Sequence, residues 1–280
     1  MVFRARQFEF VFPRPALVMG IVNVTPDSFS DGGKFLDPAA AVAHALELVK
    51  QGADILDIGG ESTRPGAGPV SEAEELRRVI PVLQQLAAQI KIPISIDTTK
   101  AAVAQAALQA GASIVNDVAA GRDNHELWKT VSEFRAGYIC MHAPGSAQTM
   151  PPRPFHADVV RAVNEFFAER LEKLSVAGIG SDQVMLDVGI GFGKTLEQHL
   201  ELLANLRSFT TLRRPLLLGV SRKSFLGKLL GAEVNERLPA SLACATLAVE
   251  AGVQVIRTHD VAETVQSVRT TEAVLARRTI

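Results

Sequence analysis

Eight short apolar segments, each followed by a segment of helical periodicity, constrain the fold of this chain most strongly. The apolar segments are continuously hydrophobic, as in parallel strands that are covered on both faces. They lie at residues 17–23, 53–58, 94–97, 113–116, 137–142, 184–187, 216–220 and 253–257. The helical patterns lie at residues 39–51, 71–89, 99–110, 125–134, 157–177, 196–206, 239–251 and 262–277.

Eight strand–helix units over roughly 250 residues predict an α/β fold of the TIM (β/α)8 barrel type. A doubly wound open sheet is the alternative fold with the same local pattern. Residues 3–12 are expected to form a short N-terminal hairpin that closes the bottom of the barrel. No linker, repeat or low-complexity tract marks a second domain, so residues 1–280 are predicted to be a single domain.

Residues that favour helix ends support these boundaries. Ser71 followed by Glu74 has the spacing of a capping box. Four glycines stand where helices are expected to end, as is common at helix C-termini, and these are Gly52, Gly111, Gly178 and Gly252.

The composition argues against several classes of protein. Hydrophobic residues make up 47% of the 280 residues, enough for a sizeable core, and the formal net charge of −1 argues against a nucleic-acid binder. No apolar run reaches the ~20 residues that cross a bilayer, and the N-terminus lacks a continuous signal-peptide core. Cys140 and Cys244 lack the paired spacing of a metal site or disulfide framework. We therefore expect a cytoplasmic protein with no membrane or nucleic-acid partner.

Nearly every predicted strand ends in a polar residue, which is where a TIM barrel collects its active-site groups. A single Asp or Asn there is also a common helix N-cap. That alternative does not explain the set, because Asp57 and Asp187 precede glycines or a Gly-rich turn rather than a helix. The set comprises Asn23, Asp57, Asp97, Asn116, His142, Asp187, Ser221, Arg222, Lys223, Arg257 and His259.

These residues divide into two chemical kinds. Carboxylates and an amide can bind the paired N–H groups at the edge of a flat nitrogen heterocycle, and these are Asp97, Asn116 and Asp187. The other kind would form an opposite face that binds an anion, and comprises Arg222, Lys223, Arg257 and His259. The alternatives are surface ion pairs for Arg222 and Arg257 and a hydrogen-bonded core position for His259.

The glycine-rich segment GIGFGKT, residues 189–195, is not a P-loop, because Val188 stands where a glycine is required. Its glycines are expected to let the backbone pass close to a flat ligand. Four histidines in helical patterns or a loop are expected at the surface, and these are His44, His125, His156 and His199. His142 stays a weaker site candidate because it ends a strand.

The chain resembles the dihydropteroate synthase family from about residue 17 to 264. The motifs that carry the resemblance are NVTPDSFSDGG, DIGGESTRPGA, SIDT, VND, GFGK, SRKSF and the RTHD of residues 257–260. The resemblance implies a TIM barrel and a defined reaction. In that reaction 4-aminobenzoate displaces pyrophosphate from 6-hydroxymethyl-7,8-dihydropterin pyrophosphate, usually with Mg²⁺, and 7,8-dihydropteroate is formed.

The resemblance also implies roles for individual residues. The pterin ring would be held by Asp97, Asn116, Asp187 and Lys223. Mg²⁺, and with it the pyrophosphate, would be bound by Asn23, and the pyrophosphate would also contact Arg257 and His259. The 4-aminobenzoate pocket would be bordered by Thr63, Arg64, Pro65, Phe29, Phe192 and Ser221. The residues expected to act in catalysis are Asn23, Asp97, Asp187, Lys223 and Arg257.

The expected chemistry is a displacement in which pyrophosphate leaves a methylene group attached to an electron-rich pterin. Cations and Mg²⁺ would stabilise the leaving anion, while carboxylates would favour positive charge on the ring. No general base is expected, since an aromatic amine is a free nucleophile at neutral pH and positioning can suffice.

Two segments depart from the family pattern. Val188 and Ile190 give DVGIGFGK in place of DPGFGFGK, and MHAPGSAQTMPPRP replaces an MHMQG-type loop. Both changes are expected to touch the pterin side of the cavity by apolar contacts. The loops at residues 25–33 and 62–68 are expected to close over bound substrates as lids, with Asp27 and Asp31 helping to hold the bound state.

Two other functions share part of this pattern. A pterin-binding methyltransferase that uses tetrahydrofolate and a corrinoid protein has the same barrel and Asp/Asn contacts, but it would not need the SRKSF and RTHD anion set. A catalytically silent paralogue that binds pterin or a partner protein is supported only by Val188 and Ile190. The resemblance further implies a homodimer and a target of sulfonamides.

Overall fold

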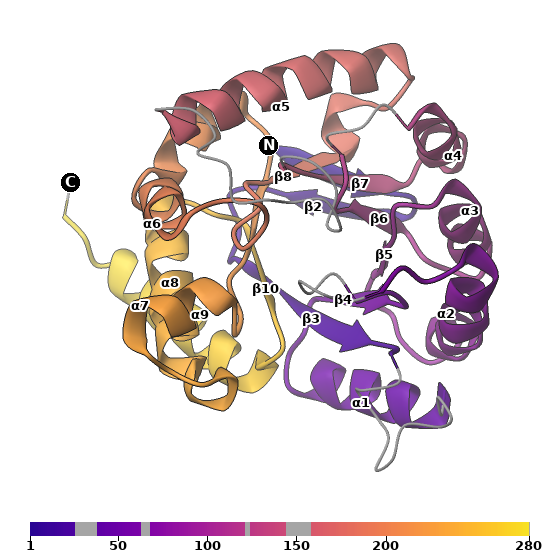
Figure 1. The fold of residues 1–280 in the computed structure, drawn as a ribbon, viewed down its shortest axis with the longest axis horizontal. Helices are drawn as coiled ribbons and strands as arrows, with labels where there is room; N and C mark the ends of the chain where they lie inside the picture. Colours follow the sequence, from indigo (N-terminus) through magenta and orange to yellow (C-terminus); the bar gives the residue numbers. More distant parts are fainter. Residues whose placement is uncertain (26–37, 63–67, 121–123, 144–157, 280) are drawn as a thin grey trace.

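Eight parallel strands close into a barrel whose order is β10-β3-β4-β5-β6-β7-β8-β9, and helices surround it (Figure 1). This computed structural model describes residues 1–25, 38–62, 68–120, 124–143 and 158–279. The closed order confirms the predicted TIM barrel and excludes the doubly wound open sheet, which would leave two strand edges unpaired. The single-domain organisation of residues 1–280 stays a prediction.

All eight predicted barrel strands are present, with boundaries within two residues of those expected. Their bounds are β3 Leu17–Asn23, β4 Ile55–Gly59, β5 Ile94–Asp97, β6 Ile114–Asp117, β7 Gly137–Met141, β8 Val184–Asp187, β9 Leu216–Gly219 and β10 Val255–Thr258. Strands β4 and β10 begin later than predicted for a shared reason. Ala53 N donates to Leu48 O and Val253 N donates to Ala248 O, so both residues complete the preceding helix end.

The predicted helices are also present. Their bounds are α1 Pro38–Lys50, α2 Glu72–Ala87, α3 Ala101–Gln109, α4 His125–Phe134, α5 Val159–Val176, α6 Leu196–Ala204, α8 Leu238–Ala251 and α9 Val261–Leu275. Sequence analysis missed the short helix α7, Ser224–Leu230, because seven residues containing Gly227 give little periodic signal. Short 3-10 helices were not predicted either, and these are η1 Ser181–Gln183, η2 Leu206–Leu212 and η3 Val234–Glu236.

The helix-end predictions are mostly confirmed. The four glycines predicted at helix ends all adopt positive φ angles that favour glycine, and these are Gly52, Gly111, Gly178 and Gly252. Ser71 accepts a hydrogen bond from Glu74 N at 3.3 Å, which is half of a capping box. The other half is wrong, because the Glu74 carboxylate pairs with Arg77 and Arg78 on the next turn.

The N-terminal hairpin closes one end of the barrel, as predicted. Its antiparallel strands are β1 Val2–Ala5 and β2 Phe8–Val11. A cluster of buried residues joins the hairpin to the first residues of several barrel strands, and comprises Phe3, Ala5, Phe10, Phe12, Leu17, Met19, Ile55, Ile114, Ile139, Met185, Leu217 and Val255. The hairpin therefore covers the N-terminal end of the barrel and leaves the carboxyl ends of the strands for other contacts.

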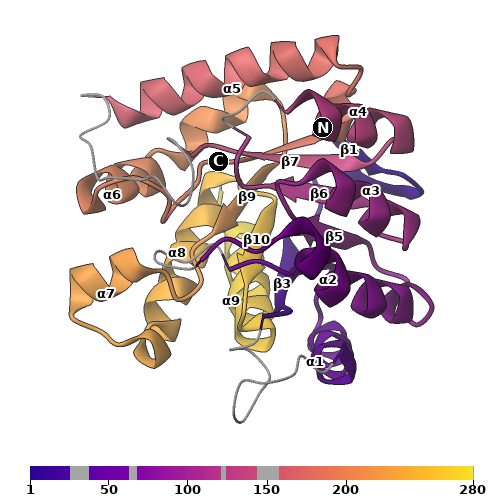
Figure 2. The ribbon, with the colours of Figure 1, turned by 45° about the vertical axis from the view of Figure 1, so that its right-hand side comes forward.

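A second and larger hydrophobic cluster fills the layer between the barrel and its helices. Strand residues contribute to it in alternation, since Val18 and Val22 lie in this layer while Leu17 and Met19 lie in the cluster beneath the barrel. Helices α8 and α9 lie side by side outside the barrel (Figure 2). Among the described helices, none combines the length and apolar character that a membrane crossing requires.

Candidate active site

Arg257, on β10, lies at the centre of the polar residues at the strand ends. Its Nε donates to Asp57 Oδ2 at 2.6 Å, and its Nη2 donates to Asp97 Oδ2 at 2.8 Å. Asn116 Nδ2 donates to the same oxygen of Asp57 at 3.0 Å. Residues from β4, β5, β6 and β10 thus meet in one hydrogen-bonded network.

This network corrects the predicted division into two separate faces. Arg257 was expected either opposite the carboxylates or in a surface ion pair. Instead its side chain is only 19% exposed and forms ion pairs with two buried carboxylates. A guanidinium buried beside carboxylates is held in place by charge-assisted hydrogen bonds. The groups predicted to bind an anion and those predicted to bind a heterocycle are therefore interleaved.

The network shifts the pKa values of its members. Burial raises the pKa of Asp97 to about 7, against the lowering effect of Arg257, and the nearby charges of Asp57, Glu75 and Asp117 add to the increase. Burial lowers the pKa of Arg257, but Asp57 and Asp97 outweigh it, so the pKa of this guanidinium is raised. Arg257 thus stays a cation at neutral pH.

Asp187 ends β8 and begins a tight turn. Gly189 N donates to Asp187 Oδ1 at 2.8 Å, which fixes the orientation of the carboxylate. Burial raises the pKa of Asp187, while Lys223 has the largest of the opposing effects. This carboxylate is therefore preorganised, with Lys223 as its neighbouring charge.

The glycines of residues 189–195 serve contacts within the protein. A Cβ on Gly189, whose φ is +70°, would lie 1.9 Å from the carbonyl oxygen of His142. A Cβ on Gly191, whose φ is +87°, would lie 2.6 Å from Lys223 Cδ. The close approaches at these two glycines are made by the backbone of His142, just after β7, and by Lys223, and the approach of a flat ligand stays a prediction.

Lys194 and Lys223 hold this glycine-rich turn from two sides. Lys194 Nζ donates to three carbonyl oxygens, those of Gly189 (2.9 Å), His142 (3.1 Å) and Phe192 (3.3 Å). Lys223 Nζ donates to Ile190 O and lies 4.5 Å from the centroid of the Phe192 ring. Burial lowers the pKa of Lys223 to about 8, although Asp187 opposes the shift. Phe192 is therefore beside Lys223.

Ser221 and His259 contact each other at the ends of β9 and β10. Ser221 Oγ lies 3.0 Å from His259 Nδ1, and His259 N donates to Ser221 Oγ at 3.1 Å. Arg222 does not share this position, because it pairs with Asp260 and its side chain is 44% exposed. Arg222 thus forms the surface ion pair named as the alternative, and its place on an anion-binding face stays a prediction.

The histidine predictions have mixed outcomes. His199 is 5% exposed and packs near Phe225, so its predicted surface position is wrong; burial, with Lys194, Lys223 and Lys228, lowers its pKa to about 4. His125 is exposed as predicted, whereas His44 is partly buried. The ring of His142 packs edge-to-face on Phe166 of α5, which indicates a place in the helix layer. His156 lies outside the described residues.

Several predicted groups cannot be assigned a position. Phe29, Thr63, Arg64 and Pro65 lie outside the described residues, as do Asp27, Asp31 and most of both proposed lids. The replaced loop after β7 also lies there from residue 144 onward. Val188 and Ile190 are described and are fully buried in the larger hydrophobic cluster. The contact of these two side chains with the pterin side of the cavity stays a prediction.

Asn23 is the predicted metal ligand at the end of β3. Within the described residues, no group of three or more His, Cys, Asp or Glu side chains could hold a metal ion. A Cβ added to Gly59 would lie 3.9 Å from Asn23 Oδ1 and 3.5 Å from Asp97 Cβ, so the amide oxygen borders the network. Mg²⁺ commonly takes one or two protein oxygens, with waters and substrate phosphates completing its shell. Asn23 fits a metal held in that way.

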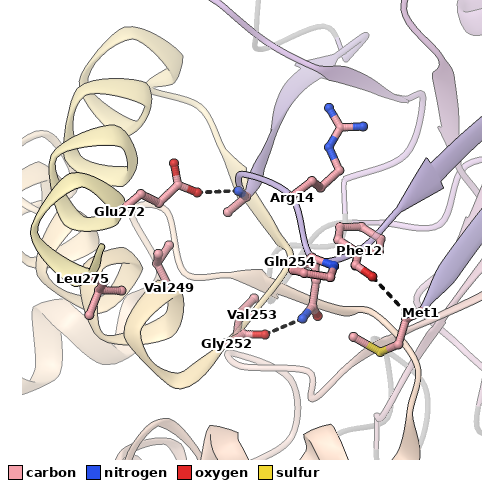
Figure 3. Close-up of a pocket in the computed structure, with 11 residues that line it drawn as sticks. Met1, Phe12, Arg14, Val249, Gly252, Val253, Gln254, Glu272 and Leu275 are labelled. Carbon is pink, nitrogen blue, oxygen red and sulfur yellow. Dashed lines mark hydrogen bonds between the residues drawn. The ribbon is translucent and has the colours of Figure 1, made fainter. Parts of the chain in front are cut away.

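A cavity of about 450 Å³ lies elsewhere, next to the hairpin and the outer helices α8 and α9 (Figure 3). Its polar groups already serve the protein's own contacts. Ala16 N donates to Glu272 Oε1 at 2.5 Å, and the Met1 ammonium donates to Phe12 O at 3.1 Å. This cavity lies away from the carboxyl ends of the strands, so the network around Arg257 is the candidate active site.

Known proteins resemble this chain over nearly its full length. Residues 19–259 match the family of pterin binding enzymes. The dihydropteroate synthase of Escherichia coli (strain K12) is 45% identical over 92% of each chain. The chain belongs to the dihydropteroate synthase family. Members of this family are transferases of folate biosynthesis, and this chain is one of them.

Solved dihydropteroate synthases share the fold. The enzyme of Yersinia pestis with a sulfonamide drug complex superimposes with a TM-score of 0.92, at 41% identity over 99% of this chain and 100% of that one. The enzyme of Xanthomonas albilineans in complex with 7,8-dihydropteroate gives a TM-score of 0.88, at 42% identity over 99% and 100%. These likenesses favour the synthase over the methyltransferase and over the silent paralogue.

Asp57 is the residue whose importance sequence reasoning missed. It was recognised only as one of several polar strand ends, and no role was assigned to it. The structure makes it the acceptor shared by Arg257 and Asn116. The sequence feature that could have indicated a role for Asp57 is its position shortly before Gly59 and Gly60. No helix begins there among the described residues, so Asp57 is not explained as a helix N-cap.

Proposed function

We propose that this chain joins 6-hydroxymethyl-7,8-dihydropterin pyrophosphate to 4-aminobenzoate, which yields 7,8-dihydropteroate and pyrophosphate. The observation that carries the proposal is the convergence of Asp97, Asn116, Asp187, Lys223 and Arg257 at the carboxyl ends of five barrel strands or just beyond them. A related synthase binds 7,8-dihydropteroate, the product of this reaction.

The pterin ring would be bound by acceptors and donors of this network. A pterin has adjacent N–H groups on one edge, and a carboxylate can accept both through charge-assisted hydrogen bonds. Asp187 is the best-oriented candidate, because Gly189 N already holds one of its oxygens. Asp97, Asn116 and Lys223 would complete the recognition of the ring.

The pyrophosphate would be stabilised as it leaves by Arg257 and His259. Asn23 would hold Mg²⁺ through its amide oxygen, and the metal when bound would supply positive charge beside the phosphates. Lys223 lies close enough to Asp187 to share in balancing the charge of the site. These groups stabilise negative charge that increases in the transition state, which is how electrostatic catalysis accelerates a displacement.

The displacement needs no base from the protein. The amine nitrogen of 4-aminobenzoate forms a bond to the pterin methylene as the carbon–oxygen bond to pyrophosphate breaks, and the amine proton is released. Phe192 and Ser221 would border the ring of the amine, together with Phe29, Thr63, Arg64 and Pro65. Asp97 and Asp187 would stabilise the positive charge that develops on the pterin.

Bound pyrophosphate is expected to help form the 4-aminobenzoate site. A sulfonamide or 4-aminobenzoate should therefore bind well only when pterin and pyrophosphate are present. A related synthase has been crystallised with a sulfonamide drug complex, which supports the proposal that this site also accepts sulfonamides. Equal affinity for the empty protein in calorimetry would contradict this order of binding.

We also propose a cytoplasmic homodimer. Support for the dimer comes from the family and from exposed apolar side chains beyond β9, such as Leu229, Leu230 and Val234. Light scattering coupled to size-exclusion chromatography would give twice the chain mass for a dimer. A monomer at micromolar concentration would contradict the proposal.

The decisive experiment measures pyrophosphate release with and without 4-aminobenzoate, with mass spectrometry of the pterin product. The synthase requires release that depends on 4-aminobenzoate and yields dihydropteroate. A silent paralogue would bind the pterin without release. A methyltransferase would instead transfer a methyl group from methyltetrahydrofolate to a corrinoid protein, so this transfer is assayed in parallel.

A further inference from the structure

Asp57, near the end of β4, connects two parts of the site that lie on different strands. Its side chain is 0% exposed. Oδ2 accepts from Arg257 Nε at 2.6 Å and from Asn116 Nδ2 at 3.0 Å. A single carboxylate oxygen thus contacts Arg257, which is proposed to bind the pyrophosphate, and Asn116, which is proposed to bind the pterin.

Backbone pairing alone does not set the separation of Arg257 and Asn116. In the barrel order β10, β3, β4, β5, β6, the strand of Asp57 has one intervening strand on each side before those of its partners. Neither partner strand is hydrogen-bonded to β4. The side chain of Asp57 therefore joins β6 to β10 directly.

Asp57 and Asp97 together define the plane of the Arg257 guanidinium. Nε is used by Asp57 and Nη2 by Asp97, and a guanidinium is planar and rigid. Among the described residues, Nη1 has no hydrogen-bond partner that would compete with an anion. The pair of carboxylates thus determines the direction from which Arg257 can contact a phosphate.

A second observation concerns the other carboxylate oxygen of Asp57. Its other oxygen, Oδ1, is buried and accepts no hydrogen bond from the described residues. A buried carboxylate oxygen without a donor is unfavourable, and such groups are uncommon in native structures. Asp57 thus has one oxygen unsatisfied within the described residues, as Glu75 has at Oε1, and Asp57 alone of the two also contacts both Arg257 and Asn116.

We propose that Asp57 is a positioning residue that fixes Arg257 and Asn116 relative to each other, so that one substrate's pterin ring and pyrophosphate group are bound together. The inference rests on the proposed function, since it assigns those two groups to the same substrate. It predicts that loss of the Asp57 charge weakens the binding of the pterin pyrophosphate and not that of the second substrate. Once the pterin pyrophosphate is bound, the binding of 4-aminobenzoate is not expected to depend on Asp57.

The test compares Asp57→Asn with wild type in steady-state kinetics. We expect KM for the pterin pyrophosphate to rise about 10- to 100-fold, the effect of losing a hydrogen bond to a charged group. With the pterin pyrophosphate saturating, KM for 4-aminobenzoate should stay within about twofold. Equal changes in both KM values, or no change in either, would overturn the positioning role.

Asp117→Asn is the matched control, because Asp117 is a buried carboxylate that pairs with Tyr138 at 2.6 Å and lies outside the network around Arg257. It should reduce stability without separating the two KM values. The same split in Asp117→Asn would show that any buried charge has this effect and would contradict the inference.

A double-mutant cycle tests whether Asp57 acts through Arg257. Arg257→Lys keeps the charge but removes the planar fork, so Asp57→Asn should change KM by less than about threefold in that background. Full additivity of the two changes would overturn the inference. If Asp57→Asn does not fold, Asp57→Ser is measured in the same cycle.

Wild-type activity is measured first, so that two failures can be told apart. An inactive wild type contradicts the proposed function. An active wild type whose Asp57→Asn variant has unchanged kinetics contradicts only the positioning role.

Discussion

Lys100 Nζ lies 2.5 Å from Oε2 of Glu75, a carboxylate whose side chain is completely buried. Lys100 also donates to Glu61, which follows β4, and Glu61 Oε1 accepts from Val70 N at 3.2 Å. The ammonium group therefore joins the first turn of α2 to the segment that leaves the end of β4. A buried carboxylate in such a group depends on its cation for stability.

Lys100→Met is expected to destabilise the protein by about 3 kcal/mol. That value is at the low end of the range for breaking a buried ion pair, because the Lys100 side chain retains some exposure. Urea unfolding measures the change in the free energy of unfolding.

Lys50→Met is the control. Lys50 Nζ lies 3.8 Å from Glu47 Oε2, and both side chains are exposed. The expected loss of stability is below about 0.5 kcal/mol. Equal losses in the two variants would contradict the argument.

Pterin binding is expected to strengthen as pH rises through about 7. Burial raises the pKa of Asp97 to about 7, and the carboxylate form is the one that accepts the N–H groups of a pterin. Below pH 7 the affinity should fall by up to about tenfold per pH unit. Calorimetry with 6-hydroxymethylpterin between pH 5.5 and 8.5 measures it.

Asp97→Asn is the control for this pH dependence. This variant should bind the pterin weakly, and its pterin affinity should no longer change near pH 7. An affinity change of unchanged size would assign the titration to another group.

The ionisation of Asp97 also affects the stability of the protein. Because the pKa of Asp97 is raised on folding, its contribution to stability is present below about pH 4 and is lost as pH rises through about 7.

Gly189→Ala and Gly231→Ala should differ although both glycines have nearly the same φ, +70° and +68°. Among the described residues, no atom beyond the chain neighbours of Gly231 lies within 4 Å of an added Cβ, so its substitution costs only the backbone strain of about 1–2 kcal/mol. At Gly189 the Cβ would meet the carbonyl oxygen of His142 at 1.9 Å, which adds about 1–3 kcal/mol. Thermal unfolding compares the two variants, and equal losses would contradict the close-approach argument.

The sequence predicts the barrel well because its evidence is local. Continuous apolar strands, helical periods and helix-ending glycines each act within one element, and parallel strands then bring their carboxyl ends together. Pairings across the barrel are not local. Arg257 contacts Asp57 and Asp97, which are 200 and 160 residues away, so no spacing in the sequence predicts that a cation lies between them.

Neighbouring residues in one motif also separate in ways that spacing does not predict. Arg222 and Lys223 are adjacent, yet Arg222 adopts φ +56° and pairs with Asp260, while Lys223 lies beside Asp187 and Phe192. The left-handed residue redirects the chain between the two side chains. The predicted surface position of His199 is wrong because α7 packs against α6, which carries His199. Helix α7 is too short to be recognised from its sequence pattern.

Asp187→Asn is expected to weaken pterin binding while the fold is kept. The amide oxygen of asparagine can still accept the hydrogen bond from Gly189 N, so the turn after β8 keeps its geometry. The variant loses the negative charge that faces Lys223, and with it a charge-assisted bond to the pterin. The expected loss is about 1.5–3 kcal/mol in pterin affinity, with a change in unfolding free energy that is smaller than this.

Calorimetry and urea unfolding measure the two quantities on the same preparation. Glu165→Gln is a suitable control, since Glu165 forms an exposed ion pair with Arg161 on α5 and its substitution should change neither quantity. Pterin affinity within twofold of wild type would remove Asp187 from the site.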